Sequence, residues 1–222
     1  MDSDNTFLNV VECFTSIQGE STHAGRVCFF IRLAGCNLEC SYCDTKYAQT
    51  PGCGQQYSLT ELLALAQASG TKLVEITGGE PALQPETPLL AELLLDNGFE
   101  VLMETNGSVR LDSFPRQLKR IIDVKLPSSG MNVANDPENY RRLHDGDELK
   151  FVVGSREDFE YALAWIDRCE LDKKAVPLIF SPVFGAVQSA ELAEWILQSK
   201  RDHLRMQLQM HKYIWHPDRR GV

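Results

Sequence analysis

The sequence predicts an α/β fold in which most strands are parallel and form an incomplete or modified (β/α) barrel. Seven apolar, β-branched runs alternate with amphipathic helical patterns along almost the whole chain, and this alternation is typical of βα units. Polar motifs follow these runs, which in a parallel barrel would place them on one face. A doubly wound open sheet is the alternative that the same pattern allows.

The expected strands are short runs rich in β-branched and aromatic residues. They cover residues 26–33, 72–77, 100–105, 120–126, 148–154, 176–183 and 204–211. Helices are expected over residues 58–69, 87–98, 155–171 and 189–200, several of them beginning at Ser or Thr. Gly98 is placed as the residue that ends the second helix. Residues 126–139 form the most loop-like part.

Size and composition indicate an ordinary globular protein with one domain over residues 1–222. Apolar residues make up 43% and charged residues 24%, and no apolar run approaches the roughly 18 residues that a membrane span needs. The formal charge of -9 disfavours direct binding of nucleic acid, which usually requires a basic face. We therefore expect no nucleic-acid partner and no membrane partner.

The start of the chain and its cysteines indicate a reducing compartment. Residues 1–11 carry acidic side chains where a secretory signal would carry basic ones, so a cytoplasmic location is expected. The seven cysteines should then stay reduced, which makes a clustered subset a metal site rather than a disulfide framework. Cys13, Cys28, Cys53 and Cys169 lie outside the cluster and are interpreted as small buried or incidental thiols.

Polar signals stand at the carboxyl end of nearly every expected strand. In chain order they are Cys36, Cys40 and Cys43, the segments 77–81 (TGGEP) and 104–107 (ETNG), Lys125, Ser181 and His211. In a parallel barrel these ends share the face on which active sites are built. A single polar loop would mean little, but six in succession predict one site.

The motif Cys-x3-Cys-x2-Cys, formed by Cys36, Cys40 and Cys43, predicts a metal centre. Thiolates suit zinc or iron–sulfur clusters. A closed zinc site needs a fourth ligand, and the fold could supply it from Cys53 or His23, so structural zinc stays an alternative. A zinc nucleobase deaminase is excluded because its H-x-E and P-C-x-x-C signature is absent. Three cysteines on a cubane would leave one iron open to an external molecule.

This spacing, with Tyr42 before the last cysteine and TGGEP after the second strand, resembles the radical S-adenosylmethionine (SAM) superfamily. The resemblance implies a radical SAM type of barrel, a 4Fe-4S cluster on the three cysteines, and S-adenosyl-L-methionine bound at the open iron. The radical would come from the cofactor, so no protein group is assigned as catalytic. Gly78, Gly79 and Glu80 would contact the methionine amino group.

Within that superfamily, the segments 14–21 (FTSIQGES), 29–45 and 209–215 (QMHKYIW) resemble the 7-carboxy-7-deazaguanine synthase family, over about residues 12–211. The resemblance implies a lyase that converts 6-carboxy-5,6,7,8-tetrahydropterin to 7-carboxy-7-deazaguanine with loss of ammonia, in 7-deazapurine and queuosine biosynthesis. It also implies Mg2+, a flavodoxin-like electron donor and a homodimer. Ser21 departs from the family, where Gly commonly follows QGE.

Some of these residues carry a signal of their own. Arg32 interrupts an apolar strand and would bind an anion such as the substrate carboxylate, or pair with a nearby acid as a structural residue. Gln18 and Glu20 could read the amide and amino edges of a pterin, whereas without the resemblance 16–21 would be interpreted as a turn. Thr45 by itself would be an N-cap or turn residue.

The resemblance assigns the remaining roles. It implies substrate binding by Ile17, Gln18, Gly19, Glu20, Arg32, Thr77 and His211, and cofactor binding by Tyr42, Asp44, Gly78, Gly79, Glu80, Lys125 and Ser181, with Thr45 as the Mg2+ ligand. The expected reaction begins with removal of a hydrogen atom from C6 of the pterin and continues with ring contraction. A glycyl-radical activase and a non-catalytic zinc or iron–sulfur module are the alternative functions.

Overall fold

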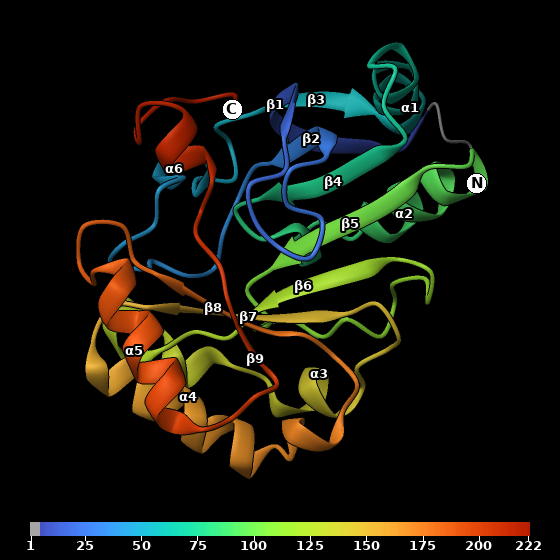
Figure 1. Ribbon diagram of the computed structural model, residues 1–222. Helices are drawn as coiled ribbons and strands as arrows, with labels where there is room; N and C mark the ends of the chain where they lie inside the picture. The colour runs from blue at the N-terminus through green and yellow to red at the C-terminus, as the bar shows by residue number, and fades with distance from the viewer. Residues whose placement is uncertain (1–4) are drawn as a thin grey trace.

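A nine-stranded sheet forms the centre of the computed structural model, which describes residues 5–222 (Figure 1). The strands are β1 Phe7–Ile17, β2 Val27–Leu33, β3 Gln55–Ser58, β4 Leu73–Gly78, β5 Glu100–Thr105, β6 Lys119–Asp123, β7 Glu148–Val153, β8 Leu178–Pro182 and β9 Leu204–Met206. Their order is β3-β1-β2-β4-β5-β6-β7-β8-β9, and β2 and β4 to β9 are parallel. Residues 1–4, part of the acidic start used for the location, lie outside the described residues.

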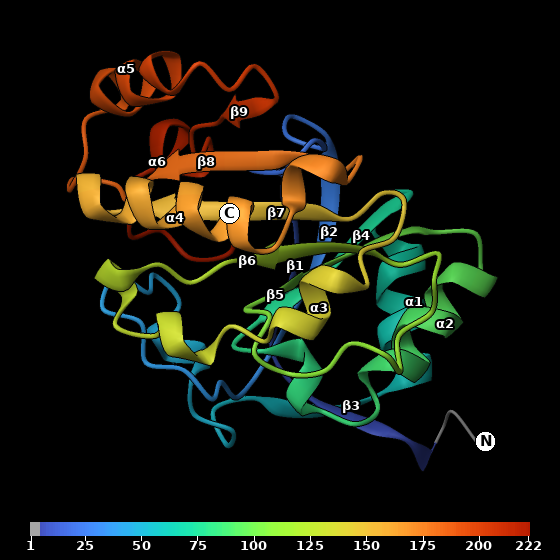
Figure 2. The same ribbon diagram turned by 90° about the horizontal axis from the view of Figure 1, so that it is seen from below.

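The helices are α1 Leu59–Ala68, α2 Thr87–Asp96, α3 Pro137–Arg141, α4 Arg156–Arg168, α5 Ser189–Ser199 and α6 His211–Ile214. Helices α1 to α5 cover the outer face of the curved sheet, whereas α6 lies at the carboxyl end of the strands (Figure 1). Figure 2 shows α4 lying along β7 and β8, with α5 beyond them. Ser58 and Ser155 cap α1 and α4, and Gly98 follows α2 with φ +79°, as expected. Within residues 5–222, no helix is long and apolar enough to cross a bilayer.

The predicted fold class is confirmed, and every expected strand and helix is present. Strands β1 and β3 were not predicted, because both are antiparallel to their partners and neither forms a continuous apolar run. Strand β1 has half-buried positions along most of its length, and β3 reads QQYS at the sheet edge. Periodicity identifies buried parallel strands more easily than partly exposed antiparallel ones.

The last predicted strand is wrong beyond Met206, and His211 begins a helix instead of ending a strand. After β9 the chain leaves the sheet and crosses to the loop that follows β1. Met210 N donates to Gly19 O at 3.0 Å, and Gln207 Nε2 donates to Ser21 O at 2.7 Å. Strand β9 does not pair with β1, so the sheet does not close into a complete barrel. The segment after β9 spans the opening instead, through these hydrogen bonds to the loop after β1.

Alternation along the parallel strands separates an apolar face from a polar one. In β7, Leu149, Phe151 and Val153 belong to the main core under the helices, whereas Lys150 points to the inner face. Arg32 in β2 is likewise on the inner face. Deeper on that face a second apolar cluster contains Cys28, Phe30, Leu73, Leu102 and Ile121. The barrel interior is therefore sealed by apolar residues at one end and polar at the carboxyl end of its strands.

At the amino end of β6, Arg120 and Asp147 form a fully buried ion pair. Arg120 Nε donates to Asp147 Oδ1 at 3.0 Å, and His144 N donates to Asp147 Oδ2 at 2.6 Å. Replacing Asp147 by Ala is expected to lower the free energy of unfolding by about 3–5 kcal/mol, because it leaves a buried charge without its partner. Urea unfolding of the full chain, followed by circular dichroism, measures the change.

Glu160→Ala is the matched control for this prediction. Glu160 pairs with Arg156 at 3.0 Å on the exposed face of α4, where the ion pair is expected to contribute about 0.5 kcal/mol or less. Equal unfolding midpoints for the two variants would show that the Arg120–Asp147 pair does not stabilise the fold.

Candidate functional site

Two adjoining cavities open at the carboxyl end of the parallel strands, with volumes of about 400 and about 390 Å³. The first, the cysteine cavity, is lined by Cys36, Cys40, Tyr42, Gly78, Gly79 and Lys125. The second, the Gln18 cavity, is lined by Ile17, Gln18, Gly19 and His211. Both are lined by Glu20, Arg32, Cys43, Asp44, Thr45, Thr77 and Glu104. The structure thus separates the residues predicted for cofactor from those predicted for substrate, and joins the two sets at a shared wall.

The three cysteines lie on the loop after β2, and all three line the cysteine cavity. Cys36 Sγ accepts from Leu38 N at 3.4 Å and from Asn106 Nδ2 at 3.8 Å. Burial raises the pKa of the Cys40 thiol, while the Lys125 ammonium lowers it. In the described part of the chain, no three His, Cys, Asp or Glu side chains converge on a single ion. Three thiols around one cavity fit a cluster with several metal corners better than one zinc ion.

Gly78 and Gly79 let the end of β4 lie directly against this cysteine loop. A Cβ at Gly78 would lie 2.1 Å from Leu33 O, and one at Gly79 would lie 2.1 Å from Gly35 O. Gly79 N donates to Leu33 O at 3.1 Å. The absent side chains therefore permit backbone-to-backbone packing, and both glycines also line the cysteine cavity.

Glu80 and Ser181 are the two predicted site residues that line neither cavity. The carboxylate of Glu80 is fully buried and accepts from Asn106 N at 2.6 Å and from Thr105 Oγ1 at 2.8 Å. It thereby ties the end of β5 to the end of β4. Ser181 is buried in β8, and its Oγ has no hydrogen-bond partner among residues 5–222. The cofactor contacts assigned to both remain predictions.

The Gln18 loop is a turn, as its residues suggest without the resemblance. Gln18 N donates to Arg26 O at 2.8 Å, and the Gln18 amide binds the carboxyl of buried Glu75. A Cβ at Gly19 would lie 2.7 Å from His211 Nδ1, so glycine permits the approach of His211. Ser21 has φ +64°, the left-handed region that glycine favours, which explains why Gly is usual there.

Arg32 combines the two roles that its sequence context allowed. Its Nε donates to Glu12 Oε1 at 2.9 Å, and Tyr47 Oη donates to the same oxygen at 2.8 Å. Its terminal nitrogens make no hydrogen bond to any residue that the structure describes, and the side chain lines both cavities. The ion pair fixes the guanidinium, and its outer edge faces the space where an anion would bind.

Thr45 and Asp44 also lie between the two cavities. Thr45 precedes the 3-10 turn Lys46–Ala48 as its N-cap, but its hydroxyl makes no capping hydrogen bond. That hydroxyl faces both cavities and lies 3.7 Å from Cys43 Sγ. Asp44 Oδ2 lies 2.8 Å from Lys212 Nζ. Thr45 therefore places a hydroxyl oxygen at the shared wall, in weak contact with Cys43 Sγ.

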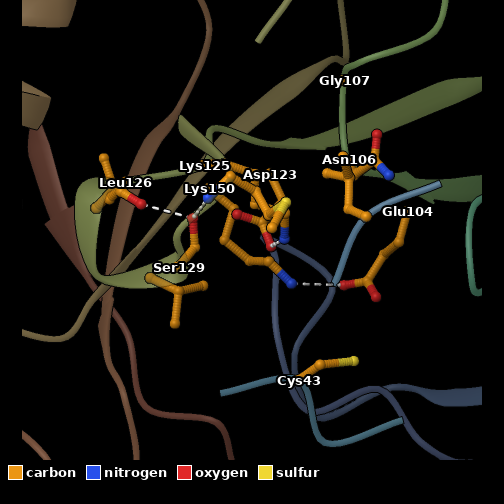
Figure 3. Close-up of polar contacts among 12 residues, drawn as sticks. Cys43, Glu104, Asn106, Gly107, Asp123, Lys125, Leu126, Ser129 and Lys150 are labelled. Atoms are coloured by element: carbon orange, nitrogen blue, oxygen red, sulfur yellow. Dashed lines mark hydrogen bonds and ion pairs between the residues drawn. The ribbon is translucent and has the colours of Figure 1, made fainter. Parts of the chain in front are cut away.

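A charged cluster lines the cysteine cavity (Figure 3), and sequence reasoning assigned a role to its Lys125 but to none of Lys150, Glu104 and Asp123. Lys150 Nζ lies 3.0 Å from Glu104 Oε1, and Lys125 Nζ lies 2.8 Å from Asp123 Oδ2. Figure 3 shows the Lys150 and Glu104 side chains pointing toward each other. Lys150 and Glu104 interrupt apolar strands, as Arg32 does. The same test that singled out Arg32 would have found them.

The chain is similar in sequence to known proteins over almost its whole length. Residues 30–169 match the radical SAM superfamily. Over 218 residues, 97% of each chain, it is 44% identical to the 7-carboxy-7-deazaguanine synthase of Chlorobaculum tepidum. It is 40% identical to that of Clostridium acetobutylicum over 220 residues, 96% of this chain and 98% of the relative.

Solved structures share the fold of this chain. QueE from Escherichia coli matches with a TM-score of 0.69 and 26% identity, covering 91% of this chain and 94% of that chain. SuiB from Streptococcus suis, bound to its precursor peptide SuiA, matches with a TM-score of 0.56 and 12% identity, covering 78% and 46%. At that identity SuiB shares the fold alone.

Gly79→Ala is expected to lower the free energy of unfolding by about 3 kcal/mol or more, because the new Cβ meets the backbone of the cysteine loop. It is also expected to reduce the iron bound per chain after anaerobic reconstitution. Urea unfolding and iron analysis measure the two effects. Gly52→Ala is the control, since a Cβ there meets nothing within 4 Å. Equal stability and iron content in both variants would contradict the packing argument.

Proposed function

The chain belongs to the radical SAM superfamily and, within it, to the 7-carboxy-7-deazaguanine synthases, and on that premise we propose how its two cavities perform the reaction. The enzyme is a radical SAM lyase that converts 6-carboxy-5,6,7,8-tetrahydropterin to 7-carboxy-7-deazaguanine with loss of ammonia. The observation that carries the proposal is the shared wall of the cysteine cavity and the Gln18 cavity. A pterin on one side of that wall would face the cofactor on the other.

The cofactors are a 4Fe-4S cluster and S-adenosyl-L-methionine, and the donor set of the cysteine cavity fits them. Cys36, Cys40 and Cys43 would hold three corners of the cluster. When bound, the two cofactors together supply a 5′-deoxyadenosyl radical. The protein contributes binding, orientation and exclusion of water. Gly78 and Gly79 would form the wall on which the nucleoside rests.

Arg32 would orient the substrate through its carboxylate. The Nε of Arg32 is held by Glu12, so the terminal nitrogens are left to form the two parallel hydrogen bonds that a carboxylate accepts. Thr45 would add a hydroxyl ligand to a Mg2+ ion that shares the same carboxylate. Fixing this group at the shared wall would aim C6 of the ring at the cysteine cavity, and positioning of this kind governs a radical reaction.

The remaining substrate contacts would come from acceptors and donors along the Gln18 cavity. Glu20 and Glu104 line both cavities and present carboxylates, which accept hydrogen bonds from ring N–H groups. Gly19 permits the close approach of His211, which lines the Gln18 cavity. Two small polar cavities of this kind suit a compact substrate, whereas a glycyl-radical activase would need a cleft open to a protein loop.

Three further features of the enzyme are proposed from the family alone. They are a flavodoxin-like electron donor, a homodimeric assembly and a cytoplasmic location. We also propose that the chain acts as one domain without a nucleic-acid partner, in keeping with its formal charge of -9.

The reaction is tested by anaerobic assay of the reconstituted chain with the tetrahydropterin, S-adenosyl-L-methionine and a reductant. The expected product is lighter than the substrate by one ammonia, as measured by mass spectrometry. Reconstitution is expected to yield about four irons per chain with broad visible absorbance. A colourless protein with a single zinc would overturn the proposal.

Arg32→Ala is expected to lower kcat/KM for the pterin about 100-fold, because the substrate carboxylate loses its charged partner. The visible spectrum of the cluster should stay unchanged. Arg156→Ala, on the exposed face of α4, is the control and should leave both unchanged. Loss of both turnover and cluster in Arg32→Ala would assign Arg32 to folding, and unchanged kcat/KM would contradict its role in binding.

A further inference from the structure

Lys150 occupies a position that the reaction described above does not use. It is the third residue of β7, whose six residues are all buried, and it points to the inner face of the sheet. Its side chain is 8% exposed, and its Nζ lies 3.0 Å from Glu20 Oε2 and 3.0 Å from Glu104 Oε1. One ammonium therefore contacts two carboxylates that come from different parts of the chain.

Hydrogen bonds from neutral side chains, together with Lys150, fix the orientations of the two carboxylates. Glu20 Oε1 accepts from Gln209 Nε2 at 3.0 Å, and Glu104 Oε2 accepts from Thr77 Oγ1 at 3.3 Å. Each carboxylate thus has one oxygen near Lys150 and the other near a neutral donor. Both residues line the two cavities, whereas Lys150 lines the cysteine cavity beneath them. Figure 3 shows the Lys150 ammonium directed at Glu104.

A buried ion pair of this kind contributes little to stability in itself. Apolar residues of similar size usually stabilise a protein interior as well or better, since charges must be removed from water. The rest of the inner face shows that apolar residues suit it, because Phe30, Leu73 and Leu102 pack there. A lysine with two glutamates at the cavity floor therefore points to a role toward a bound molecule.

The local charges show what the ammonium does. Burial alone would lower the pKa of Lys150, but the carboxylates of Glu104, Glu20 and Asp123 outweigh burial and hold that pKa well above its usual value. Lys150 is therefore a permanent cation and not a proton acceptor. Glu75, deeper in the same cluster, has its pKa raised well above its usual value by burial and by the charge of Glu104. Lys150 supplies the positive charge that lies 3.0 Å from both Glu20 and Glu104.

We propose that Lys150 is a positioning residue that holds the carboxylates of Glu20 and Glu104 ionised and aimed as paired acceptors for the N–H groups of the substrate's aminopyrimidinone ring. The inference rests on the proposed function and deepens it. The amino group and ring N–H of a pterin are donors, and only an ionised carboxylate offers acceptors on both oxygens. A protonated glutamic acid would present a donor in place of one acceptor and would penalise the correct ring.

The test compares Lys150→Met with Lys119→Met in the cluster-loaded enzyme. Lys119 pairs with Glu100 at 2.6 Å at the opposite end of the strands, so its variant removes a lysine ion pair away from the cavities. Lys150→Met is expected to raise KM for the pterin about tenfold or more, with the cluster spectrum and the affinity for S-adenosyl-L-methionine unchanged. Lys119→Met should change none of these quantities.

A pH profile separates positioning from simple packing. In Lys150→Met the carboxylates of Glu20 and Glu104 lose the cation that lies 3.0 Å from each, so the acidic limb of kcat/KM against pH should move to higher pH. Lys150→Arg, which keeps the charge, should restore the profile in whole or part. A KM within twofold of the unsubstituted enzyme, or an acidic limb that does not move, would overturn the proposal.

A second variant and a measurement without substrate complete the test. If Lys150→Met fails to fold, the double variant Lys150→Met/Glu104→Gln removes one negative charge with the positive one and should fold; an unchanged KM in it would overturn the proposal. Titration of 13C-glutamate carboxyls by NMR in the full chain, assigned with Glu20→Gln and Glu104→Gln, needs no substrate. A raised carboxyl pKa in Lys150→Met without any pterin turnover by the parent would indicate that the proposed function fails while Lys150 still controls the carboxylates.

Discussion

Parallel alignment of seven strands is the constraint on which the rest of this structure depends. Because β2 and β4 to β9 all run in the same direction, the residues after each strand reach a single rim. Alternation of side chains then assigns every second residue to the inside of the curved sheet. The cysteine loop, the glycine pair and the inner charged residues come together for this geometric reason. Only β1 and β3, which are antiparallel to their neighbours, lie outside the pattern.

The cavities are built from compensated charges. Arg32 pairs with Glu12, Lys125 with Asp123, and Lys150 with both Glu20 and Glu104. Each pair spans different segments of the chain or a strand and the turn after it. Such pairs cost desolvation energy and gain fixed geometry, which suits a site that must orient a charged, hydrogen-bonding substrate beside a reactive cofactor. The apolar cluster that contains Phe30 and Leu102 fills the barrel interior beneath these charged residues.

The segment after β9 meets the loop after β1 at the proposed substrate cavity. The segment after β9 contributes Gln207, Gln209 and His211, and it binds the loop after β1 through backbone and side-chain hydrogen bonds. Gly19 is required at the point of closest approach, where any Cβ would meet His211. A local sequence motif at one end of the chain therefore owes its form to a segment nearly two hundred residues away.

The sequence by itself determined the fold class, the seven parallel strands, the four long helices and the rim on which the polar motifs meet. These follow from local periodicity and from cysteine spacing, which depend only on neighbouring residues. Tertiary structure alone decided which charges pair. Lys150 meets Glu20 and Glu104 across 130 and 46 residues, a distance over which periodicity carries no information. It also decided that Glu80 holds the end of β5 and that His211 begins a helix, because both depend on contacts between segments remote in the chain.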